Sequence, residues 1–145
     1  MDVSIRLMKK SDAPHVLDMM SVFYRSPAVH TNGSEEIFAS DIENCLNENP
    51  YLEGYIIEVD GKTVGYGMIA KSFSTEFGKS CIWIEDLYLT EEYRGRGVGK
   101  IFFDFITAKY EGAIFRLEVE AENERAMKLY KKCGFTTLPY MEMIK

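Results

Sequence analysis

The sequence lacks the features of membrane-spanning and exported proteins. No apolar run approaches the ~18 residues that a transmembrane helix needs. The first residues, Met1–Arg6, have neither a basic n-region nor an apolar h-region, so no signal peptide is expected. Cysteine is scarce, and the thiols of Cys45, Cys81 and Cys133 are odd in number and not at metal-ligand spacing. These absences predict a cytoplasmic protein with free thiols, no membrane partner and no metal ion.

Basic residues are missing from a long part of the chain. No Lys or Arg lies between Arg25 and Lys62. The same stretch carries eight carboxylates: Glu35, Glu36, Asp41, Glu43, Glu48, Glu53, Glu58 and Asp60. Basic residues return from Arg94 onward, so one half suits a cation and the other an anion. A solvated acidic helix face explains the acidic stretch equally well. The net charge of −6 argues against a nucleic-acid partner.

The residues that are present indicate one α/β domain over residues 1–145. A content of 46% hydrophobic and 28% charged residues is ordinary for a globular chain of this length. Apolar patterns predict strands at 3–7, 54–59, 63–70, 82–89, 113–119 and 140–144. Helical spacing predicts helices from Ser11–Pro14 to Ser26–Pro27, at about 35–48, at 98–109 and at 123–133. We expect a hairpin turn at Asp60–Gly61 and a polar loop over 72–79. The order predicts a mixed, largely antiparallel sheet in which strands 82–89 and 113–119 are parallel.

The most informative stretch is a strand, a glycine-rich turn and the start of a helix. Strand 82–89 leads into three glycines within residues 95–99, which free the backbone to turn tightly. A helix that opens on glycines presents free N–H groups and the positive end of its dipole, a site suited to phosphate. Arg94, Arg96 and Lys100 add positive charge. The stretch therefore predicts a diphosphate site.

Two common glycine motifs fail at this turn. A dinucleotide fingerprint that starts at Gly95 needs a third glycine where the chain has Lys100. A P-loop needs glycine where the chain has Arg94, and Ser or Thr where it has Ile101. We therefore expect neither a dinucleotide nor a nucleoside triphosphate as the ligand.

The pattern Arg94-x-x-Gly97-x-Gly99 resembles the acyl-CoA pyrophosphate loop of the GNAT superfamily of N-acetyltransferases. A later block from Asn123 to Phe135, with Ala126, Tyr130 and Gly134 at matching places, is similar to a second motif of that family. The segment Ile84–Leu89 is also similar to the corresponding strand of the diamine (spermidine/spermine-type) branch. The resemblance implies a mixed, mostly antiparallel central sheet with a splayed parallel strand pair and about four helices. Only ten residues follow Phe135, whereas the family usually has two more strands there, so a homodimer is expected to help close this sheet edge.

The same resemblance implies how acetyl-CoA is bound. The phosphates are expected at the turn formed by Arg94, Gly95, Arg96, Gly97, Val98, Gly99 and Lys100. The backbone of Leu87, Tyr88 and Leu89 is expected to pair with the pantetheine arm, with the Leu87 N–H on the thioester carbonyl. Asn123 and Ala126 are expected to contact that arm from the other side. The resemblance assigns Tyr130 as the acid that protonates the leaving thiolate.

The acceptor side needs a base, because an amine of pKa ~10.4 is mostly protonated at neutral pH. Glu85, acting through water, is the candidate base, and Asp86 is the candidate substrate contact. Neighbouring strand residues point to opposite faces unless a bulge intervenes, so one of the two carboxylates could instead face solvent. Trp83, Tyr66 and Tyr88 are candidates for the wall of the acceptor site, although each is also an ordinary strand aromatic.

These inferences lead to one main functional hypothesis and two alternatives. The main hypothesis is an acetyl-CoA-dependent N-acetyltransferase that moves the acetyl group to a primary amine of a small cationic molecule, by direct attack in a ternary complex. The alternative enzyme is a protein lysine or N-terminal acetyltransferase. The alternative of another class is a non-catalytic CoA-binding sensor, which the presence of both Tyr130 and Glu85 disfavours.

Overall fold

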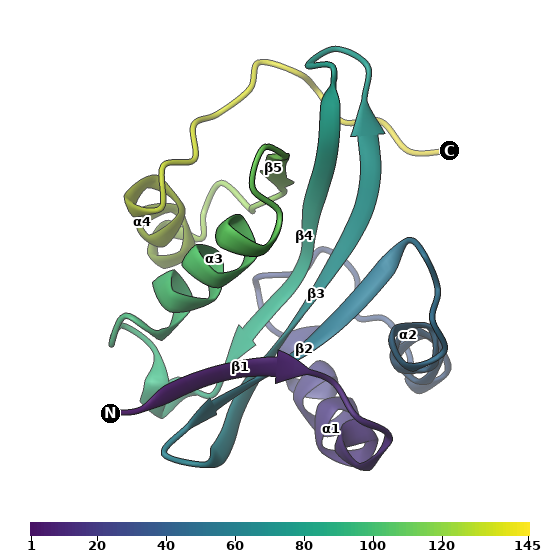
Figure 1. Cartoon of the computed structure of the whole chain (residues 1–145), viewed down its shortest axis with the longest axis vertical. Coiled ribbons are helices and arrows are strands. Elements are labelled where there is room, and N and C mark those ends of the chain that lie inside the picture. Colours follow the sequence, from purple (N-terminus) through teal and green to yellow (C-terminus); the bar gives the residue numbers. More distant parts are fainter.

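The computed structural model describes all residues 1–145 and is built around one five-stranded sheet (Figure 1). The strands are β1 (Val3–Leu7), β2 (Leu52–Val59), β3 (Lys62–Ser74), β4 (Lys79–Leu89) and β5 (Ile114–Leu117). They lie in the order β1-β2-β3-β4-β5. Every neighbouring pair is antiparallel except β4 and β5, which are parallel. The predicted fold class, including the parallel pair, is confirmed.

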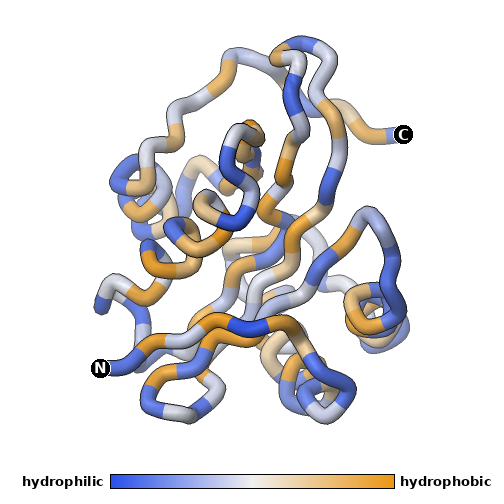
Figure 2. The backbone as a smooth tube through the Cα atoms, viewed as in Figure 1, coloured by the Kyte–Doolittle hydropathy of each residue, from blue (hydrophilic) through white to orange (hydrophobic).

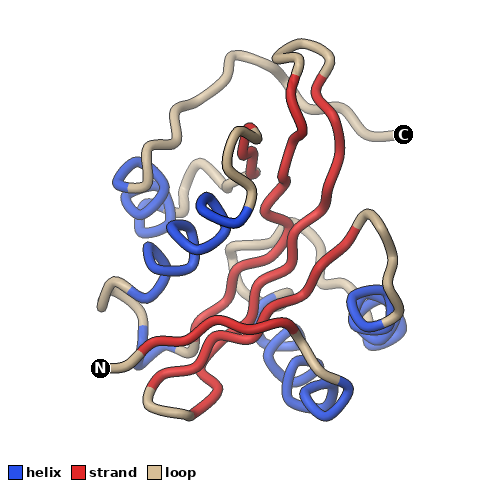
Figure 3. Tube along the Cα trace, viewed as in Figure 1, coloured by secondary structure: helices blue, strands red, loops and turns tan.

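Helices cover both faces of the sheet (Figure 3). They are α1 (Ala13–Phe23), α2 (Glu35–Leu46), α3 (Val98–Lys109) and α4 (Glu124–Lys132), with short 3-10 turns at Lys10–Asp12 and Glu91–Tyr93. On one face, Val16 and Met20 of α1 and Phe38 of α2 form a buried cluster with sheet residues. On the other face, Phe102 and Ile106 of α3 belong to a second cluster. None of the helices is long and apolar enough to cross a membrane.

Local sequence signals explain where several elements begin. Ser34 caps α2, because its hydroxyl accepts a hydrogen bond from the N–H of Ile37 at 3.2 Å. The predicted hairpin turn is present, with φ of +51° at Asp60 and +79° at Gly61. Positive φ at both central residues is the type I′ geometry, which matches the twist of the flanking strands β2 and β3.

The predicted polar loop over residues 72–79 is wrong, because both flanking strands continue into it. Ser74 pairs with Lys79, so only residues 75–78 turn, and Gly78 adopts φ +64°. Apart from Phe73, residues 71–74 and 79–80 are polar and resemble a loop in composition. They can nevertheless form strands, since the solvated end of an antiparallel hairpin needs no buried face.

The predicted final strand over 140–144 is also wrong, and the predicted strand over 113–119 is shorter than expected. β5 has only the four residues Ile114–Leu117, and no strand pairs with its outer edge. The last residues cross toward the β3–β4 hairpin without joining the sheet (Figures 1 and 2). Met143 is 89% and Ile144 100% exposed. Apolar alternation alone does not make a strand when the backbone has no neighbour to pair with.

Candidate active site

A β-bulge at Glu85 sets the direction of the acidic side chains on β4. Met68 pairs with Asp86 and Ile69 pairs with Ile84, so Glu85 has no partner on β3. Before the bulge, Ile84 packs in the buried cluster that contains Phe102 and Ile106 of α3. After the bulge, Asp86 hydrogen-bonds to Tyr24 at the end of α1, on the other face. The extra residue reverses the alternation of the strand, so the Asp86 side chain faces α1 and α2.

Asp86 is a buried carboxylate with both oxygens occupied. It is 4% exposed. The hydroxyl of Tyr24 at the end of α1 donates to Oδ1 at 2.9 Å, and that of Tyr66 on β3 donates to Oδ2 at 2.8 Å. Burial raises the pKa of Asp86 to about 6, although the two phenolic hydrogen bonds oppose the shift. Its position lets it orient two phenols more readily than bind a cation directly.

Further carboxylates surround Glu85. Partial burial raises the pKa of Glu85, and the charges of Asp41 on α2 and Glu142 in the C-terminal tail add to the shift. Glu142 also lies beside Glu118, just after β5, and the proximity of the two carboxyl groups raises the pKa of Glu118 to about 7. The acidic side chains thus come together from α2, β4, the end of β5 and the tail.

The backbone of β4 beyond the bulge is open on its β5 side. β5 ends at Leu117, which pairs with Ile84, so the residues of β4 after Ile84 have no parallel neighbour. The N–H of Thr90 donates to Val64, on the β3 side, at 2.8 Å. Because hydrogen-bonding direction alternates along a strand, the N–H of Leu87 points away from β3 and into this opening. The N–H of Leu87 is therefore a free backbone donor in the opening where β4 and β5 diverge.

The glycine turn that follows β4 has the geometry of a phosphate site. Gly95 and Gly97 have φ of +70° and +86°, a region that side-chain-bearing residues rarely adopt. The first helical hydrogen bond runs from Ile101 N–H to Gly97 O at 3.2 Å. The N–H groups of residues 98–100 therefore have no carbonyl partner and carry the positive end of the α3 dipole. A Cβ added at Gly97 would meet no atom within 4 Å, so the turn is accessible from outside.

Gly99 has a packing role that the sequence motif does not reveal. A Cβ at this position would lie 2.9 Å from Cδ2 of Leu129 on α4. Gly99 and Val98 are both buried. The glycine at this place in the motif lets α3 and α4 pack closely.

The predicted basic residues differ in how freely they can move. Arg94 donates from Nε to the carbonyl of Leu89 at 2.8 Å, and its guanidinium lies 5.5 Å from the centre of the Tyr88 ring. Arg96 donates to the carbonyl of Glu92 at 3.4 Å. Lys100 forms an exposed ion pair with Asp104 at 2.6 Å. Arg94 is therefore held against the end of β4, whereas Lys100 can exchange its partner at little cost.

Helix α4 brings the second predicted group of residues to the opening. Oδ1 of Asn123 caps the helix by accepting from the N–H of Ala126 at 3.3 Å, which leaves its NH2 group free. The ring of Tyr130 packs edge-on against Phe103 and Phe135, at 5.8 and 6.1 Å between centroids. Its hydroxyl has no hydrogen-bond partner in the protein, and burial raises its pKa. The phenol is therefore protonated at neutral pH, as an acid must be.

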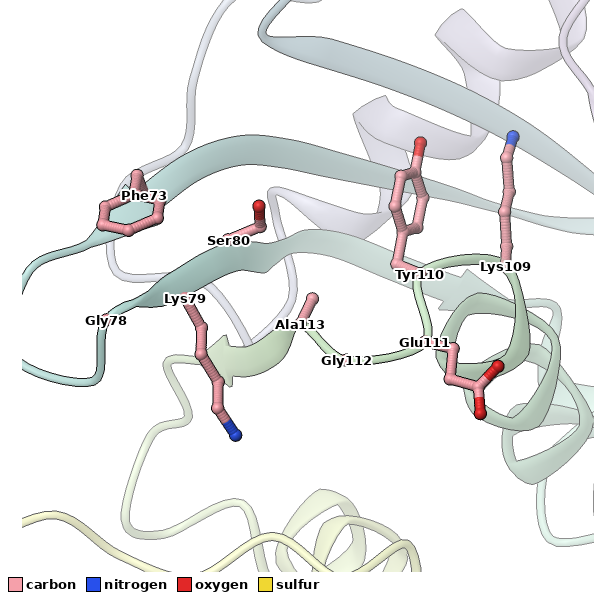
Figure 4. Close-up of a pocket in the computed structure, with 9 residues that line it drawn as sticks. All are labelled: Phe73, Gly78, Lys79, Ser80, Lys109, Tyr110, Glu111, Gly112 and Ala113. Carbon is pink, nitrogen blue, oxygen red and sulfur yellow. The ribbon is translucent and has the colours of Figure 1, made fainter.

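A pocket of about 460 Å³ lies between the glycine turn and the start of α4. Its lining includes Arg94, Asn123 and Arg125, together with Ser26–Ala28 from the α1–α2 loop. A second pocket of similar volume lies between the β3–β4 hairpin and the α3–β5 loop (Figure 4). No predicted site residue lines that second pocket. No group of three or more His, Cys, Asp or Glu side chains is arranged to hold a metal ion.

Sequence reasoning missed three residues that the fold brings to the site. Tyr24 and Glu142 lie far along the chain from Asp86 and Glu85, and Arg125 lies inside the second motif without being part of it. Only a register with the bulge in place could have predicted the Tyr24 contact. Trp83, in contrast, is covered by Arg116, whose guanidinium lies 4.7 Å from the ring centre, so it does not form an open aromatic wall.

Comparisons with known proteins agree with this geometry. Residues 16–135 match the model of the acetyltransferase (GNAT) family. The thialysine N-epsilon-acetyltransferases of Sus scrofa and Bos taurus are 31% and 32% identical to the chain, and each alignment covers 97% of it and 88% of the relative. A relative from Bacillus subtilis (strain 168), named for alanine N-acetylation of ribosomal protein bS18, is 28% identical over 90% of this chain and 79% of its own.

Solved structures share the fold at low sequence identity. A crystal structure of a possible acetyltransferase from Clostridium difficile 630 matches with a TM-score of 0.82 at 18% identity and covers 99% of this chain and 96% of its own. Aminoglycoside N-acetyltransferase AAC(6')-Iy in complex with CoA matches with a TM-score of 0.79 at 16% identity, over 99% and 94% of the two chains. The family match, the named relatives and the phosphate-type turn converge, and the chain belongs to the GNAT family as an acetyl-CoA-dependent N-acetyltransferase.

Proposed function

We propose that this enzyme acetylates a primary amine of a small cationic molecule, bound on the α1–α2 side of β4. The single observation that carries the proposal is the bulge at Glu85, which turns Asp86 toward α1 and places Glu85 within the field of Asp41. A group of carboxylates with raised pKa values binds a cation favourably, because the cation relieves their mutual repulsion.

Aromatic residues beside the carboxylates support a small molecule with an apolar stem. Phe23 of α1 packs against Tyr66 and Tyr88, with ring centroids 6.4 and 6.0 Å away. Tyr24 packs against Phe38 of α2 at 5.0 Å. Aromatic rings beside carboxylates suit alkylammonium groups, which combine a charge with methylene groups. The thialysine acetyltransferase relatives and the similarity of Ile84–Leu89 to the diamine branch favour the same substrate class.

The reaction proceeds by direct attack within a ternary complex. Glu85, acting through water, takes the proton from the ammonium group, and the free amine nitrogen attacks the thioester carbonyl carbon. The N–H of Leu87 donates to the thioester oxygen as negative charge develops on it. The carbon–sulfur bond then breaks, and Tyr130 gives its phenolic proton to the leaving sulfur. The nitrogen of the new amide loses its second proton through water, and Tyr130 is reprotonated. The raised pKa of Glu85 makes it a stronger base, and that of Tyr130 keeps its proton available.

A protein acceptor is the second candidate. The Bacillus subtilis relative named for alanine N-acetylation of a ribosomal protein favours it. The two candidates differ at the acceptor end, since a peptide N-terminus needs an open path for the chain that follows its first residue. A non-catalytic CoA sensor is disfavoured because the chain has a candidate base, Glu85, a candidate acid, Tyr130, and an open N–H at Leu87.

The test is a panel of amines with release of the CoA thiol as the readout. The panel holds diamines and triamines, lysine and its side-chain analogues, aminoglycosides, and peptides with a free N-terminal alanine. We expect the highest kcat/KM on a small molecule with at least one ammonium group besides the reacting amine. Preference for the peptides would replace this proposal with the protein-acceptor alternative. Preference for a neutral or anionic amine would contradict the cation argument.

A further inference from the structure

We propose that Arg125 of α4 is a ligand of the CoA diphosphate and acts from the side opposite the glycine turn. Its Nη2 lies 3.1 Å from the place that a Cβ would occupy on Gly95. Gly95 is part of the phosphate turn, whereas Arg125 lies in the first turn of a different helix. The guanidinium therefore reaches from α4 to the glycine turn, where the phosphates are expected to bind.

Arg125 is free to bind, unlike the arginines of the turn itself. Arg94 and Arg96 each donate to a carbonyl of their own segment and lie over a tyrosine ring. Arg125 forms no ion pair or side-chain hydrogen bond within the protein. Its side chain is exposed, so a ligand can reach it without displacing a partner. A planar fork of N–H donors is suited to bind two phosphate oxygens at once.

The acids around Arg125 limit where an anion can sit. Three glutamates, Glu120, Glu122 and Glu124, line the same pocket and repel phosphate. None of them lies within ion-pair distance of Arg125, so its charge is not neutralised. The favourable place for a diphosphate is therefore the Gly95 end, where the guanidinium meets the free N–H groups of α3.

This assignment has a structural consequence for the enzyme. The side chain of Leu129 on α4 packs over Gly99 of α3, so the two helices already touch one turn beyond the pocket. A diphosphate held by α3 on one side and Arg125 on the other joins the helices a second time. The bound cosubstrate then fixes α4, the helix that carries Tyr130, against the rest of the site.

The experiment measures the affinity of three ligands for the full chain by calorimetry: CoA, 3′-dephospho-CoA and pantetheine. The variants are Arg125→Met, which keeps the stem without the charge, and Arg125→Lys, which keeps the charge without the fork. Lys128→Met is the matched control, because Lys128 is an exposed cation on the same helix that does not line the pocket. Thermal unfolding without ligand shows whether each variant is folded.

We expect Arg125→Met to weaken CoA and 3′-dephospho-CoA alike, by about 10- to 100-fold, since a hydrogen bond to a charged group contributes that much. Arg125→Lys should lie in between, pantetheine affinity should not change, and Lys128→Met should resemble the unaltered enzyme. Unchanged CoA affinity in a folded Arg125→Met variant overturns the proposal. A loss confined to CoA would assign Arg125 to the 3′-phosphate instead, and an equal loss for pantetheine would show that it acts on the arm or on the fold.

Discussion

The hydroxyl of Tyr24 donates a 2.9 Å hydrogen bond to Oδ1 of Asp86 and so joins the end of α1 to the bulged part of β4. The other carboxylate oxygen accepts from Tyr66 at 2.8 Å. A buried carboxylate that holds two phenols in place affects the acceptor site through them. The position of Tyr24 therefore depends on Asp86, although the two residues lie far apart in the sequence.

We predict that Asp86→Asn and Tyr24→Phe both raise KM for the acceptor and leave CoA affinity unchanged. The amide of the Asp86→Asn variant has one oxygen and cannot accept from both phenols with full strength, and the Phe side chain has no hydroxyl to orient. Steady-state kinetics with the best amine from the panel, together with calorimetry for CoA, measure the two quantities separately. If Tyr24→Phe leaves the acceptor KM unchanged while Asp86→Asn raises it, Asp86 contacts the cation directly.

The raised pKa of Asp86 also predicts how stability depends on pH. Its folded-state pKa of about 6 exceeds the ~3.9 of an unfolded chain, so folding favours the protonated form. This contribution is complete below pH ~4 and is lost as the pH rises through about 6. The loss amounts to about 3 kcal/mol in order of magnitude, at ~1.4 kcal/mol per pKa unit.

Urea unfolding at a series of pH values tests this sign. The unaltered protein should lose more unfolding free energy than Asp86→Asn between pH ~4 and pH ~7. Asp18→Asn, at an exposed carboxylate on α1, is the control for the removal of one negative charge. Parallel pH curves for the unaltered protein and Asp86→Asn would contradict the burial argument.

Tyr130→Phe should lower kcat and have little effect on CoA affinity or stability. The Phe ring keeps the edge-on packing with Phe103 and Phe135 and loses only the proton donor. Removal of one general acid typically lowers the rate ~10²–10⁴-fold. A loss of thermal stability with unchanged kcat would instead make Tyr130 a packing residue.

Gly97 and Gly99 should respond differently to substitution by alanine. Gly97→Ala places a Cβ on a backbone with φ +86°, which costs about 1–2 kcal/mol, and it also obstructs the phosphate turn. Gly99→Ala pushes against Leu129 and should lower stability through α3–α4 packing.

A double-substitution cycle separates the two effects. Leu129→Ala should make Gly99→Ala less costly, because the shortened side chain leaves room for the new methyl group. It should not change the cost of Gly97→Ala. Additive losses for Gly99→Ala and Leu129→Ala would show that the close approach does not limit packing.

The sequence predicts best those features that depend on neighbouring residues. Helix 98–109 and the Asp60–Gly61 turn are predicted correctly because apolar spacing and turn residues act locally. The parallel strand pair is predicted correctly because it follows from the strand–helix–strand order. The side that Asp86 faces depends on a single extra residue at Glu85, which only the pairing with β3 reveals. Whether residues 140–144 form a strand depends on whether a free sheet edge lies within reach of them, and composition does not contain that information.

The pH dependence of kcat/KM in the Glu85→Gln variant is the most direct test, because it depends on both the amine acceptor and the proposed base. The measurement is kcat/KM on the best amine, from pH ~6 to pH ~10, for the unaltered enzyme and the variant. The raised pKa of Glu85 predicts that the unaltered rate increases above the ordinary carboxylate range, as the base loses its proton. The variant should lose about 10²–10⁴-fold at neutral pH and recover as the amine approaches its own pKa of ~10.4. An unaltered rate at neutral pH in Glu85→Gln would contradict the account.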